Sequence, residues 1–439
     1  MAPLIELDAT VADLYRTHGL TGPFITSTHC SFAHLDLHPF WPRETVFPED
    51  EEPIPYSADE QERNRIRKII LGLKPLRRAL ILGDMDVIFL SPCAAKENVD
   101  RVFNQLVPEQ RPRARYINLE EGDVDQQLQQ LSQGRKLIYW RPQGWMLEHE
   151  CLVPPRVAYE INSKLFLVNS GIRTPASEPV ELAPNVSDSV LGTRKPPFVV
   201  KLFLAGCGFG THLVTSEARR QTMLAAMAEY QSRGGTHVLL SEYIGAKQSD
   251  LSTHFIIGAP SDAHNRNNPL IMGVAMQSLT NDGHWMGSSI DYGAQEEMRD
   301  LLRDTIRDTT QRLPECFVGW CGVDVLIDEQ NGQWVVDLNA RFTGSMALCL
   351  LSSHFYKRLG FRFAEAGSFQ YRGECGDVSE ILSRDIESGK VVVNAVASID
   401  DGVNMVDLIW GGHSRQDLAL TAGLLRAELS RERGSVEEA

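Results

Sequence analysis

The chain has 439 residues, of which 43% are hydrophobic and 23% charged, as in a globular protein of two or three domains. Its net charge of −15 argues against general binding to nucleic acids or anionic membranes, because both need a positive surface. No apolar run reaches the roughly 18 residues that span a bilayer, and no signal-peptide pattern opens the chain. Eight scattered cysteines without zinc-site spacing indicate free thiols. We therefore expect a cytoplasmic protein that binds neither nucleic acid nor membrane.

The first third of the chain alternates short apolar runs with helical stretches. Strands are predicted at 79–82, 87–90, 115–119 and 136–140, and a helix at 58–74. This alternation is typical of a parallel α/β sheet. The turn after the first run lacks the Gly-x-Gly-x-x-Gly pattern, so a dinucleotide site is not expected there.

Two lysines and a glycine-rich segment follow the N-terminal region. A helix at 156–173 carries Lys164, and a strand at 197–201 ends in Lys201. Gly206, Gly208 and Gly210 then form a loop whose backbone N–H groups suit phosphate binding. Considered alone, Lys164 could be a solvated helix lysine and the loop a plain flexible turn.

The middle of the chain predicts a mixed α+β region. We expect a helix at 216–233, a strand at 237–244 with Glu242 near its end, and an antiparallel pair at 253–258 and 270–276, with an exposed loop at 262–268. A helix is predicted at 295–312. Beyond it, helices at 345–360 and 416–433 and a strand at 390–398 are expected.

The stretch from 322 to 345 holds the strongest chemical signal. Two apolar runs, 323–327 and 334–338, flank a polar glycine-containing turn, which predicts a β-hairpin. Asp337 and Asn339 are two residues apart and so share one face, and symmetric pairing would bring Asp324 close to Asp337. Two carboxylates and an amide oxygen suit Mg²⁺, with phosphate and water as further ligands. Arg341 would add positive charge on the same face.

The order of these features resembles the ATP-grasp superfamily over residues 160–355. The resemblance implies an ATP-grasp fold with an N-terminal parallel α/β domain at 1–155, an ATP-grasp domain at 156–360 that holds ATP between two subdomains, and a small C-terminal extension at 361–439. Its implied cofactors are ATP and Mg²⁺ or Mn²⁺.

The resemblance also implies roles for individual residues. It implies phosphate contacts from Lys164 and Lys201, and a flexible phosphate loop from Gly206 through Gly208 to Gly210. An adenine hinge is implied at Glu242, Tyr243 and Ile244, and a ribose contact at Asp250. The metal ligands are implied to be Asp324, Asp337 and Asn339, with Arg341 steadying the transferred phosphate.

The chain departs from the pattern of the superfamily that it resembles at several places. Asp337 stands where the superfamily usually has Glu, and Gly322 stands where D-alanine–D-alanine ligases carry an arginine. The region after residue 360 does not follow the carboxylase type. The pattern is most similar to stand-alone amino-acid and peptide ligases.

The favoured function is an ATP-dependent carboxylate–amine ligase that acts through an acyl phosphate on small-molecule substrates, with a homodimer as one assembly. A nucleotide-binding regulatory protein and a phosphotransferase without an amine step remain alternatives. Substrate contacts are expected from the segments 20–40, 260–290 and 345–375.

Overall fold

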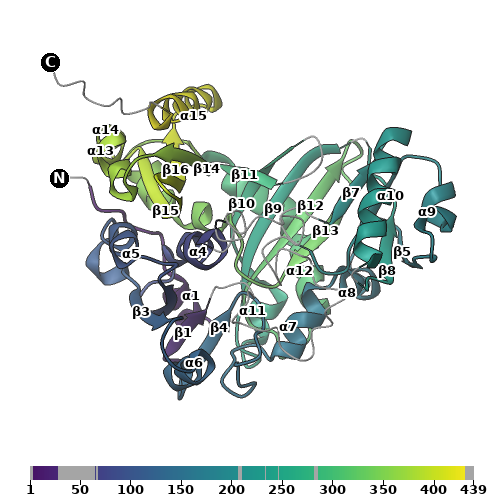
Figure 1. Ribbon diagram of the computed structural model, residues 1–439, viewed down its shortest axis with the longest axis horizontal. Coiled ribbons are helices and arrows are strands. Elements are labelled where there is room, and N and C mark those ends of the chain that lie inside the picture. The colour runs from purple at the N-terminus through teal and green to yellow at the C-terminus, as the bar shows by residue number, and fades with distance from the viewer. Residues whose placement is uncertain are drawn as a thin grey trace.

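A computed structural model describes residues 3–27, 65, 68–205, 210–232, 234–245, 247–280 and 285–430. Three sheets organise this part of the chain. In Figure 1 the N-terminal sheet lies at the lower left, the long strands of the largest sheet cross the centre, and a second four-stranded, helix-covered sheet lies at the right. The architecture is the mixed α/β and α+β arrangement that the sequence predicts.

The N-terminal sheet has four parallel strands in the order β3-β2-β1-β4. Its strands are β1 (Phe24–Ser27), β2 (Asp86–Ser91), β3 (Arg113–Asn118) and β4 (Lys136–Tyr139). Its helices are α1 (Val11–Thr17), α4 (Lys74–Ala79), α5 (Lys96–Phe103) and α6 (Val124–Ser132). The last three strands match the predicted runs, and strand β1 was missed because only two of its four residues, Phe24 and Ile25, are apolar, so no apolar run marks it.

The strand predicted at 79–82 is wrong. Ala79 ends α4, and the next three residues form a buried turn before β2. The four residues form an unbroken apolar run, and all four side chains are fully buried. An apolar run of this kind does not distinguish a buried strand from the buried end of a helix. Most of the helix predicted at 58–74 lies outside the described residues; its described end is the π-helical turn Ile69–Leu73, which continues into α4.

The second four-stranded sheet follows the order β5-β8-β6-β7 and is antiparallel. Its strands are β5 (Ser177–Glu181), β6 (Phe198–Lys201), β7 (Thr211–Val214) and β8 (His237–Ser241). Helix α10 (Glu217–Ser232) packs on it through Met223, Leu224 and Met227, which share a buried cluster with Phe198 and Val238. Short helix α9 (Val190–Thr193) lies beside it.

The largest sheet has eight strands in the order β13-β12-β9-β10-β11-β14-β16-β15. These are β9 (Lys247–Ile257), β10 (Leu270–Leu279), β11 (Trp285–Asp291), β12 (Gly319–Asp328), β13 (Gln333–Asn339), β14 (Phe363–Arg372), β15 (Val391–Asp400) and β16 (Val403–Gly412). The antiparallel pairing of β9 with β10 confirms that prediction. Beyond residue 360 the sequence predicted one strand, whereas three strands extend the same sheet.

Two predicted helices prove to be interrupted. The stretch 156–173 divides into α7 (Pro155–Asn162) and α8 (Lys164–Asn169), because Ser163 leaves the helical conformation and its Oγ accepts a hydrogen bond from the Leu165 N–H as the cap of α8. The stretch 345–360 forms the 3₁₀ helix Met346–Leu350 and the π-helical turn Ser353–Arg358. The helices α12 (Gln295–Arg312) and α15 (Arg415–Leu429) lie where they were predicted.

The loop predicted at 262–268 contains a short helix, α11 (Ala263–Asn267). Asn265 is buried there, and its Oδ1 accepts a hydrogen bond from the Gly258 N–H. The loop is therefore only partly exposed, because one polar side chain satisfies the backbone at the end of β9.

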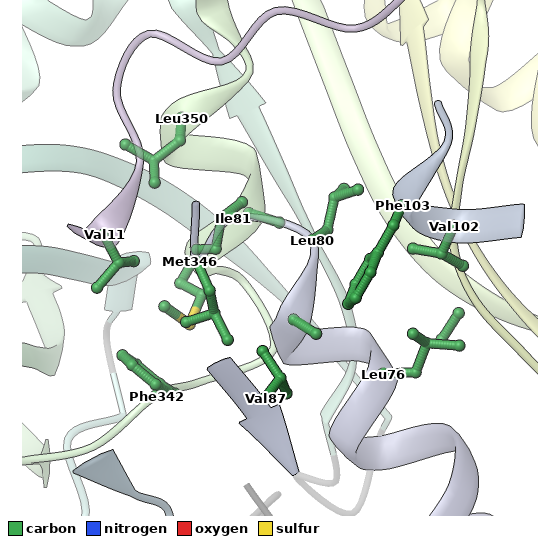
Figure 2. Close-up of a cluster of buried hydrophobic side chains, with 14 of the residues drawn as sticks. Val11, Leu76, Leu80, Ile81, Val87, Val102, Phe103, Phe342, Met346 and Leu350 are labelled. Carbon is green, nitrogen blue, oxygen red and sulfur yellow. The ribbon is translucent and has the colours of Figure 1, made fainter. Parts of the chain in front are cut away.

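A shared apolar core joins the N-terminal sheet to the segment that follows β13. Figure 2 shows Leu76 and Leu80, from α4 and its end, packed near Val87 and Phe103, with Phe342 and Met346 in the same cluster. Helix α4 is thus fixed against both its own sheet and the segment after the predicted metal-binding hairpin. No helix in the described ranges is both long and apolar enough to cross a bilayer.

A buried hydrogen bond also joins α1 to β12. The Trp320 N–H donates to the Tyr15 hydroxyl at 3.0 Å, and Tyr15 is only 2% exposed. We expect Tyr15→Phe to lower the free energy of unfolding by about 1–2 kcal/mol, because it leaves a buried donor without its acceptor. Urea denaturation followed by circular dichroism measures this loss. The half-exposed Tyr356, changed to Phe, is the matched control, and an equal loss in both variants would contradict the prediction.

Candidate active site

The β12–β13 hairpin forms as the sequence predicts. Asp324 pairs directly with Asp337, and Gly322 pairs with Asn339, with an irregularity in the register just after Asp324. The Asn339 Nδ2 lies 3.4 Å from the Asp324 Oδ2, so the two carboxylates and the amide meet at one place. The spacing of these residues along the two strands thus places their side-chain oxygens in one cluster.

The turn of this hairpin is fixed by one side chain. Asp328 accepts hydrogen bonds from the backbone N–H groups of Gln330 and Gly332 and from the Trp334 indole N–H, at 2.7–2.9 Å. These bonds lower the pKa of Asp328. Asn331 takes the left-handed conformation, with φ of 62°, that such turns require. The register that places Asp324 opposite Asp337 therefore follows from a locally determined turn.

Both predicted lysines reach the hairpin. The Lys164 Nζ, at the start of α8, lies 3.2 Å from the Asp337 Oδ1 and 3.3 Å from the Ala205 carbonyl oxygen. The Lys201 Nζ, at the end of β6, donates to the Val336 carbonyl at 2.9 Å. Two ammonium groups therefore lie beside the two carboxylates, although Lys164 and Lys201 are 37 residues apart in the chain.

The buried charges of this cluster make the folded protein less stable and are suited to binding a charged ligand. Burial, together with the charges of Asp337 and Asp250, raises the pKa of Asp324 to about 7. Burial, and next the charge of Lys164, lowers the pKa of Lys201 to about 8, against the opposing effect of the aspartates. The pKa values of both groups thus lie near neutral pH, because the buried environment penalises their charged forms.

Two further residues, which were not predicted from the sequence, contact the hairpin. Hydrogen bonds from Ser252 and Gln277 lower the pKa of Asp324 against the effect of burial. Ser252 is directly opposite Asp324 in the β9–β12 register. The only available signal was its position two residues after Asp250, which places both on one face of β9.

A cavity of about 270 Å³ contains most of the predicted site residues. Those that line it are Lys164, Lys201, Glu242, Tyr243, Ile244, Asp250, Asp324, Asp337, Asn339 and Arg341. Apolar side chains lie between them: Pro175, Val199, Leu213, Leu326 and Val336. The structure therefore brings these residues together, while their roles in binding stay predictions.

The predicted hinge at 242–244 follows directly after β8. The strand ends at Ser241 rather than at 244, and the Glu242 N–H donates to the Ala176 carbonyl oxygen at 2.8 Å. Tyr243 and Ile244 are partly buried against the cavity. A segment beside apolar side chains suits a flat heteroaromatic ring, and the adenine hinge that the resemblance implies stays a prediction.

The predicted glycine loop connects the antiparallel strands β6 and β7. Gly206 and Gly208 lie outside the described residues. Gly210 has a φ of +68°, and its carbonyl oxygen accepts a hydrogen bond from the Leu202 N–H at 2.8 Å. A Cβ at position 210 would approach the side chains of Leu202 and Ala205 to 3.0 Å, so glycine is required here. Gly210 does not line the cavity among the described residues.

One end of the cavity was predicted only in part. Lys74, Arg77 and Arg78 of α4 line it together with Trp140 and Arg141, which follow β4. Trp285 of β11 and the segment 341–345 complete the lining. Arg341 was predicted as a site residue, and Trp285 and Ser345 lie in the predicted substrate segments 260–290 and 345–375. The residues of α4 and those after β4 come from parts of the chain that carry no recognisable motif, so only the packing of the sheets reveals them.

The donor atoms of the hairpin fit a hard divalent cation. Within the described ranges, no group of three or more His, Cys, Asp and Glu side chains is arranged to hold a metal without other ligands. Two carboxylates and one amide leave coordination positions for phosphate and water, as Mg²⁺ sites in phosphoryl-transfer enzymes usually do. Asp324, Asp337 and Asn339 could therefore hold Mg²⁺ or Mn²⁺ together with a bound nucleotide.

Comparison with known proteins identifies the central region. Residues 162–345 match the family model described as the ATP-grasp domain. The chain contains an ATP-grasp domain. This match covers both lysines, the glycine loop, the hinge and the whole hairpin, and it confirms the predicted superfamily. A search of curated protein sequences found no significant match.

Solved structures share the ATP-grasp fold at low sequence identity. Phosphoribosylamine–glycine ligase from Thermotoga maritima is 13% identical with a TM-score of 0.54, covering 92% of this chain and 96% of that one. An Aspergillus clavatus carboxyaminoimidazole ribonucleotide synthase complexed with ATP is 12% identical with a TM-score of 0.51, covering 82% and 96%. Biotin carboxylase from Campylobacter jejuni is 11% identical with a TM-score of 0.50, covering 94% and 92%.

The likeness to biotin carboxylase bears on the region after residue 360. The sequence analysis set this region apart from the carboxylase type, but at the level of fold the likeness covers 94% of the present chain. The strands β14 and β16, which the sequence analysis missed, belong to this region and extend the large sheet. The separation from carboxylases therefore does not hold for the fold.

The glycine at position 322 of the ATP-grasp domain has a steric reason. Gly322 is opposite His254 in the β9–β12 register, and a Cβ at this position would lie 3.1 Å from the His254 Nδ1. His254 is fully buried, its Nε2 lies 2.8 Å from the Ser345 Oγ, and burial lowers its pKa to about 3. A neutral imidazole thus occupies the space beside the position where D-alanine–D-alanine ligases carry an arginine.

Proposed function

We propose that this protein is an ATP-dependent carboxylate–amine ligase. The observation that carries the proposal is the meeting of Asp324, Asp337 and Asn339 with Lys164 and Lys201 in one cavity of an ATP-grasp domain. Phosphoryl transfer needs alignment and neutralisation of charge more than it needs a covalent catalyst. The cavity offers both and needs no nucleophilic side chain.

In the proposed reaction a carboxylate oxygen of the acid substrate attacks the γ-phosphorus of ATP. The bond between the γ-phosphorus and the bridging oxygen breaks, which yields an acyl phosphate and ADP. The nitrogen of an amine substrate then attacks the acyl carbon, the carbon–oxygen bond to phosphate breaks, and the nitrogen loses a proton to solvent. The products are an amide, ADP and phosphate.

The residues of this chain have distinct parts in the proposal. Lys164 and Lys201 offset the negative charge of the ATP phosphates, and Arg341 offsets charge at the transferred group. Asp324, Asp337 and Asn339 would hold Mg²⁺ or Mn²⁺, which when bound neutralises phosphate oxygens. The hinge at 242–244 positions adenine, and Asp250 contacts the ribose.

The proposal predicts ADP release that requires both an acid and an amine. We expect a panel of carboxylic acids and amino acids, mixed with ATP and Mg²⁺, to contain at least one pair that gives ADP well above the rate with either substrate alone. When hydroxylamine replaces the amine, an acyl hydroxamate should form from the trapped acyl phosphate. Coupled ADP detection and mass spectrometry provide the two measurements.

Two alternatives give different results in the same experiment. A nucleotide-binding regulatory protein would bind ATP but release no ADP with any pair. A phosphotransferase would release ADP with an acceptor alone and give no amide. Either outcome across a broad panel would contradict the ligase proposal.

A further inference from the structure

A hydrogen-bonded chain of three buried side chains ends at the wall of the cavity. The Trp320 Nε1 lies 3.4 Å from the His254 Nδ1, and the His254 Nε2 lies 2.8 Å from the Ser345 Oγ. Trp320 of β12 and His254 of β9 are both buried. Ser345 is only 4% exposed, yet it lines the cavity. The chain therefore connects the interior of the large sheet with the cavity.

Trp320 fixes the direction of each hydrogen bond in this chain. An indole N–H group can only donate, so the His254 Nδ1 is the acceptor and carries no proton. The neutral imidazole then carries its proton on Nε2, which donates to the Ser345 Oγ. The hydroxyl hydrogen of Ser345 is therefore not donated to His254, because the facing nitrogen is itself a donor.

The fold does not use the hydroxyl hydrogen of Ser345. Ser345 is the N-cap residue of the 3₁₀ helix Met346–Leu350, but its side chain caps none of the helix N–H groups. A serine at an N-cap commonly accepts such a hydrogen bond. In the part of the chain that the structure describes, His254 is the only hydrogen-bond partner of the Ser345 Oγ. The O–H group is thus a donor at the cavity wall that no described residue accepts.

The residues before Ser345 hold this segment at the wall. A Cβ at position 344 would lie 2.9 Å from the Trp285 ring, so Gly344 lets the indole pack directly on the backbone. The Trp285 Nε1 donates to the Ser288 Oγ at 3.0 Å, which fixes the ring. Thr343 also lines the cavity, and its buried Oγ1 has no hydrogen-bond partner among the described residues. Both hydroxyl groups of the segment therefore keep a hydrogen-bonding capacity that is costly to leave unused.

The chemistry of the Ser345 donor indicates the class of its ligand. An O–H donor needs an acceptor with a lone pair. A protonated amine has none, and a neutral amine must keep its lone pair for attack on the acyl carbon. A carboxylate, in contrast, accepts hydrogen bonds at both oxygens. Since other lining residues are assigned to adenine, ribose, phosphates and metal, the carboxylate of the acid substrate is the group that fits.

We infer that Ser345 binds the acid substrate of the proposed ligase by donating a hydrogen bond to its carboxylate, and that His254 positions the Ser345 hydroxyl for this contact. Asn339, Arg341 and Ser345 belong to one short segment and all line the cavity. A carboxylate at Ser345 therefore lies near the groups assigned to the metal and the transferred phosphate. The inference rests on the proposed function, because it names a residue that binds one substrate of the same site.

Ser345→Ala tests the contact directly. The KM for the acid substrate should rise about 10-fold with a smaller change in kcat, because the lost hydrogen bond goes to a charged group of the bound acid. The KM values for ATP and for the amine should change less than about twofold. Ser189→Ala, which removes a buried hydroxyl outside the cavity lining, is the matched control. An unchanged KM for the acid, or a rise only for the amine or ATP, would overturn the inference and leave the ligase proposal intact.

Variants of His254 test the positioning role. His254→Gln keeps an N–H donor for the Ser345 Oγ and should hold the KM for the acid within about threefold of the wild-type value. His254→Phe removes the donor and should raise this KM as much as Ser345→Ala does. The double variant should show no further rise, because both changes remove one contact. A full additional rise would refute the positioning role. If His254→Phe does not fold, His254→Gln decides: a 10-fold rise in KM would refute the role.

Two measurements are independent of turnover. NMR spectra of isotope-labelled histidine, assigned with His254→Gln, should show a neutral His254 with its proton on Nε2, and a proton on Nδ1 would overturn the inference. In the presence of Mg²⁺ and ADP, ligand-observed NMR should detect binding of at least one of acetate, propionate, succinate and benzoate. Ser345→Ala should weaken this binding about 10-fold, and Ser189→Ala should not.

The outcomes separate this inference from the proposed function. Equal carboxylate affinity in the wild-type protein and Ser345→Ala, or no binding of any of the four acids to the wild-type protein, would overturn the inference, even if a substrate pair released ADP. Carboxylate binding that depends on Ser345, without ADP release from any pair of the panel, would contradict the ligase proposal and support the Ser345 contact.

Discussion

Asn339→Ala should reduce turnover by at least about 10³-fold while the protein stays folded. Asn339 is one of three oxygen donors at the hairpin, and its amide already lies 3.4 Å from Asp324. Loss of a metal ligand removes charge neutralisation at the phosphates, which is the main catalytic requirement of phosphoryl transfer. Steady-state ADP release at saturating Mg²⁺ measures the effect, and circular dichroism checks the fold.

Asp337→Ala should be equally inactive but less stable. Asp337 is the ion-pair partner of Lys164, which is only 5% exposed, so its removal leaves a buried cation without that partner. Asp337→Asn keeps the shape and separates the two effects.

A metal readout distinguishes ligand loss from other causes. Mn²⁺ binding in the presence of ADP, followed by electron paramagnetic resonance, should weaken in both hairpin variants. Glu329→Gln, an exposed carboxylate in the turn of the same hairpin, is the matched control and should keep full activity. Normal activity of Asn339→Ala or Asp337→Asn at saturating Mg²⁺ would refute their assignment as ligands.

Lys201→Met should lower kcat/KM for ATP by about 10²–10³-fold without destabilising the protein. Burial and the neighbouring Lys164 lower the pKa of Lys201 to about 8, below the ordinary value for lysine, so its charged form is disfavoured in the fold. A lysine whose pKa is lowered by folding makes the folded state less stable at a pH where the lysine is protonated. Removal of the charge therefore does not reduce stability at pH 7, although the variant loses the hydrogen bond to Val336.

The lowered pKa of Lys201 also predicts how the stability of the protein depends on pH. Between pH 8 and 10.5 the unfolded chain holds a proton on Lys201 that the folded chain has released, so this residue makes stability rise with pH in that window. Lys201→Met should flatten this rise, and nucleotide affinity of the wild-type protein should fall as pH passes 8. Thermal unfolding and ADP titrations over pH 6–10 provide the measurements.

A matched lysine separates a local effect from a general charge effect. Lys195→Met removes an exposed lysine of the same region and should change neither kcat/KM nor the pH dependence. If Lys195→Met and Lys201→Met had equal effects, or if Lys201→Met kept wild-type affinity for ATP, the assignment of Lys201 to the phosphates would be wrong.

Where the sequence succeeded, the pattern was local or strongly periodic. Helix α12 was predicted with its observed bounds because its apolar positions recur with helical spacing along 18 residues. The sequence-based prediction failed at β1, where only Phe24 and Ile25 are apolar, and at 79–82, where a fully apolar run shows neither alternation nor helical spacing. Helix 156–173 was predicted as one element, since the break at Ser163 depends on a capping interaction that apolar periodicity does not show.

The sequence by itself determined the hairpin. Its turn is fixed by Asp328 and its neighbours, and pairing about a turn places Asp324 opposite Asp337 wherever the hairpin lies in the molecule. The end of the cavity that Arg78, Trp140 and Arg141 line was decided only by the tertiary structure. Arg78, Arg141 and Arg341 are far apart in the chain and meet because α4, the end of β4 and the segment after β13 share one packed core. Packing between distant elements leaves no spacing that a sequence motif could carry, whereas a hairpin's register is set within its own residues.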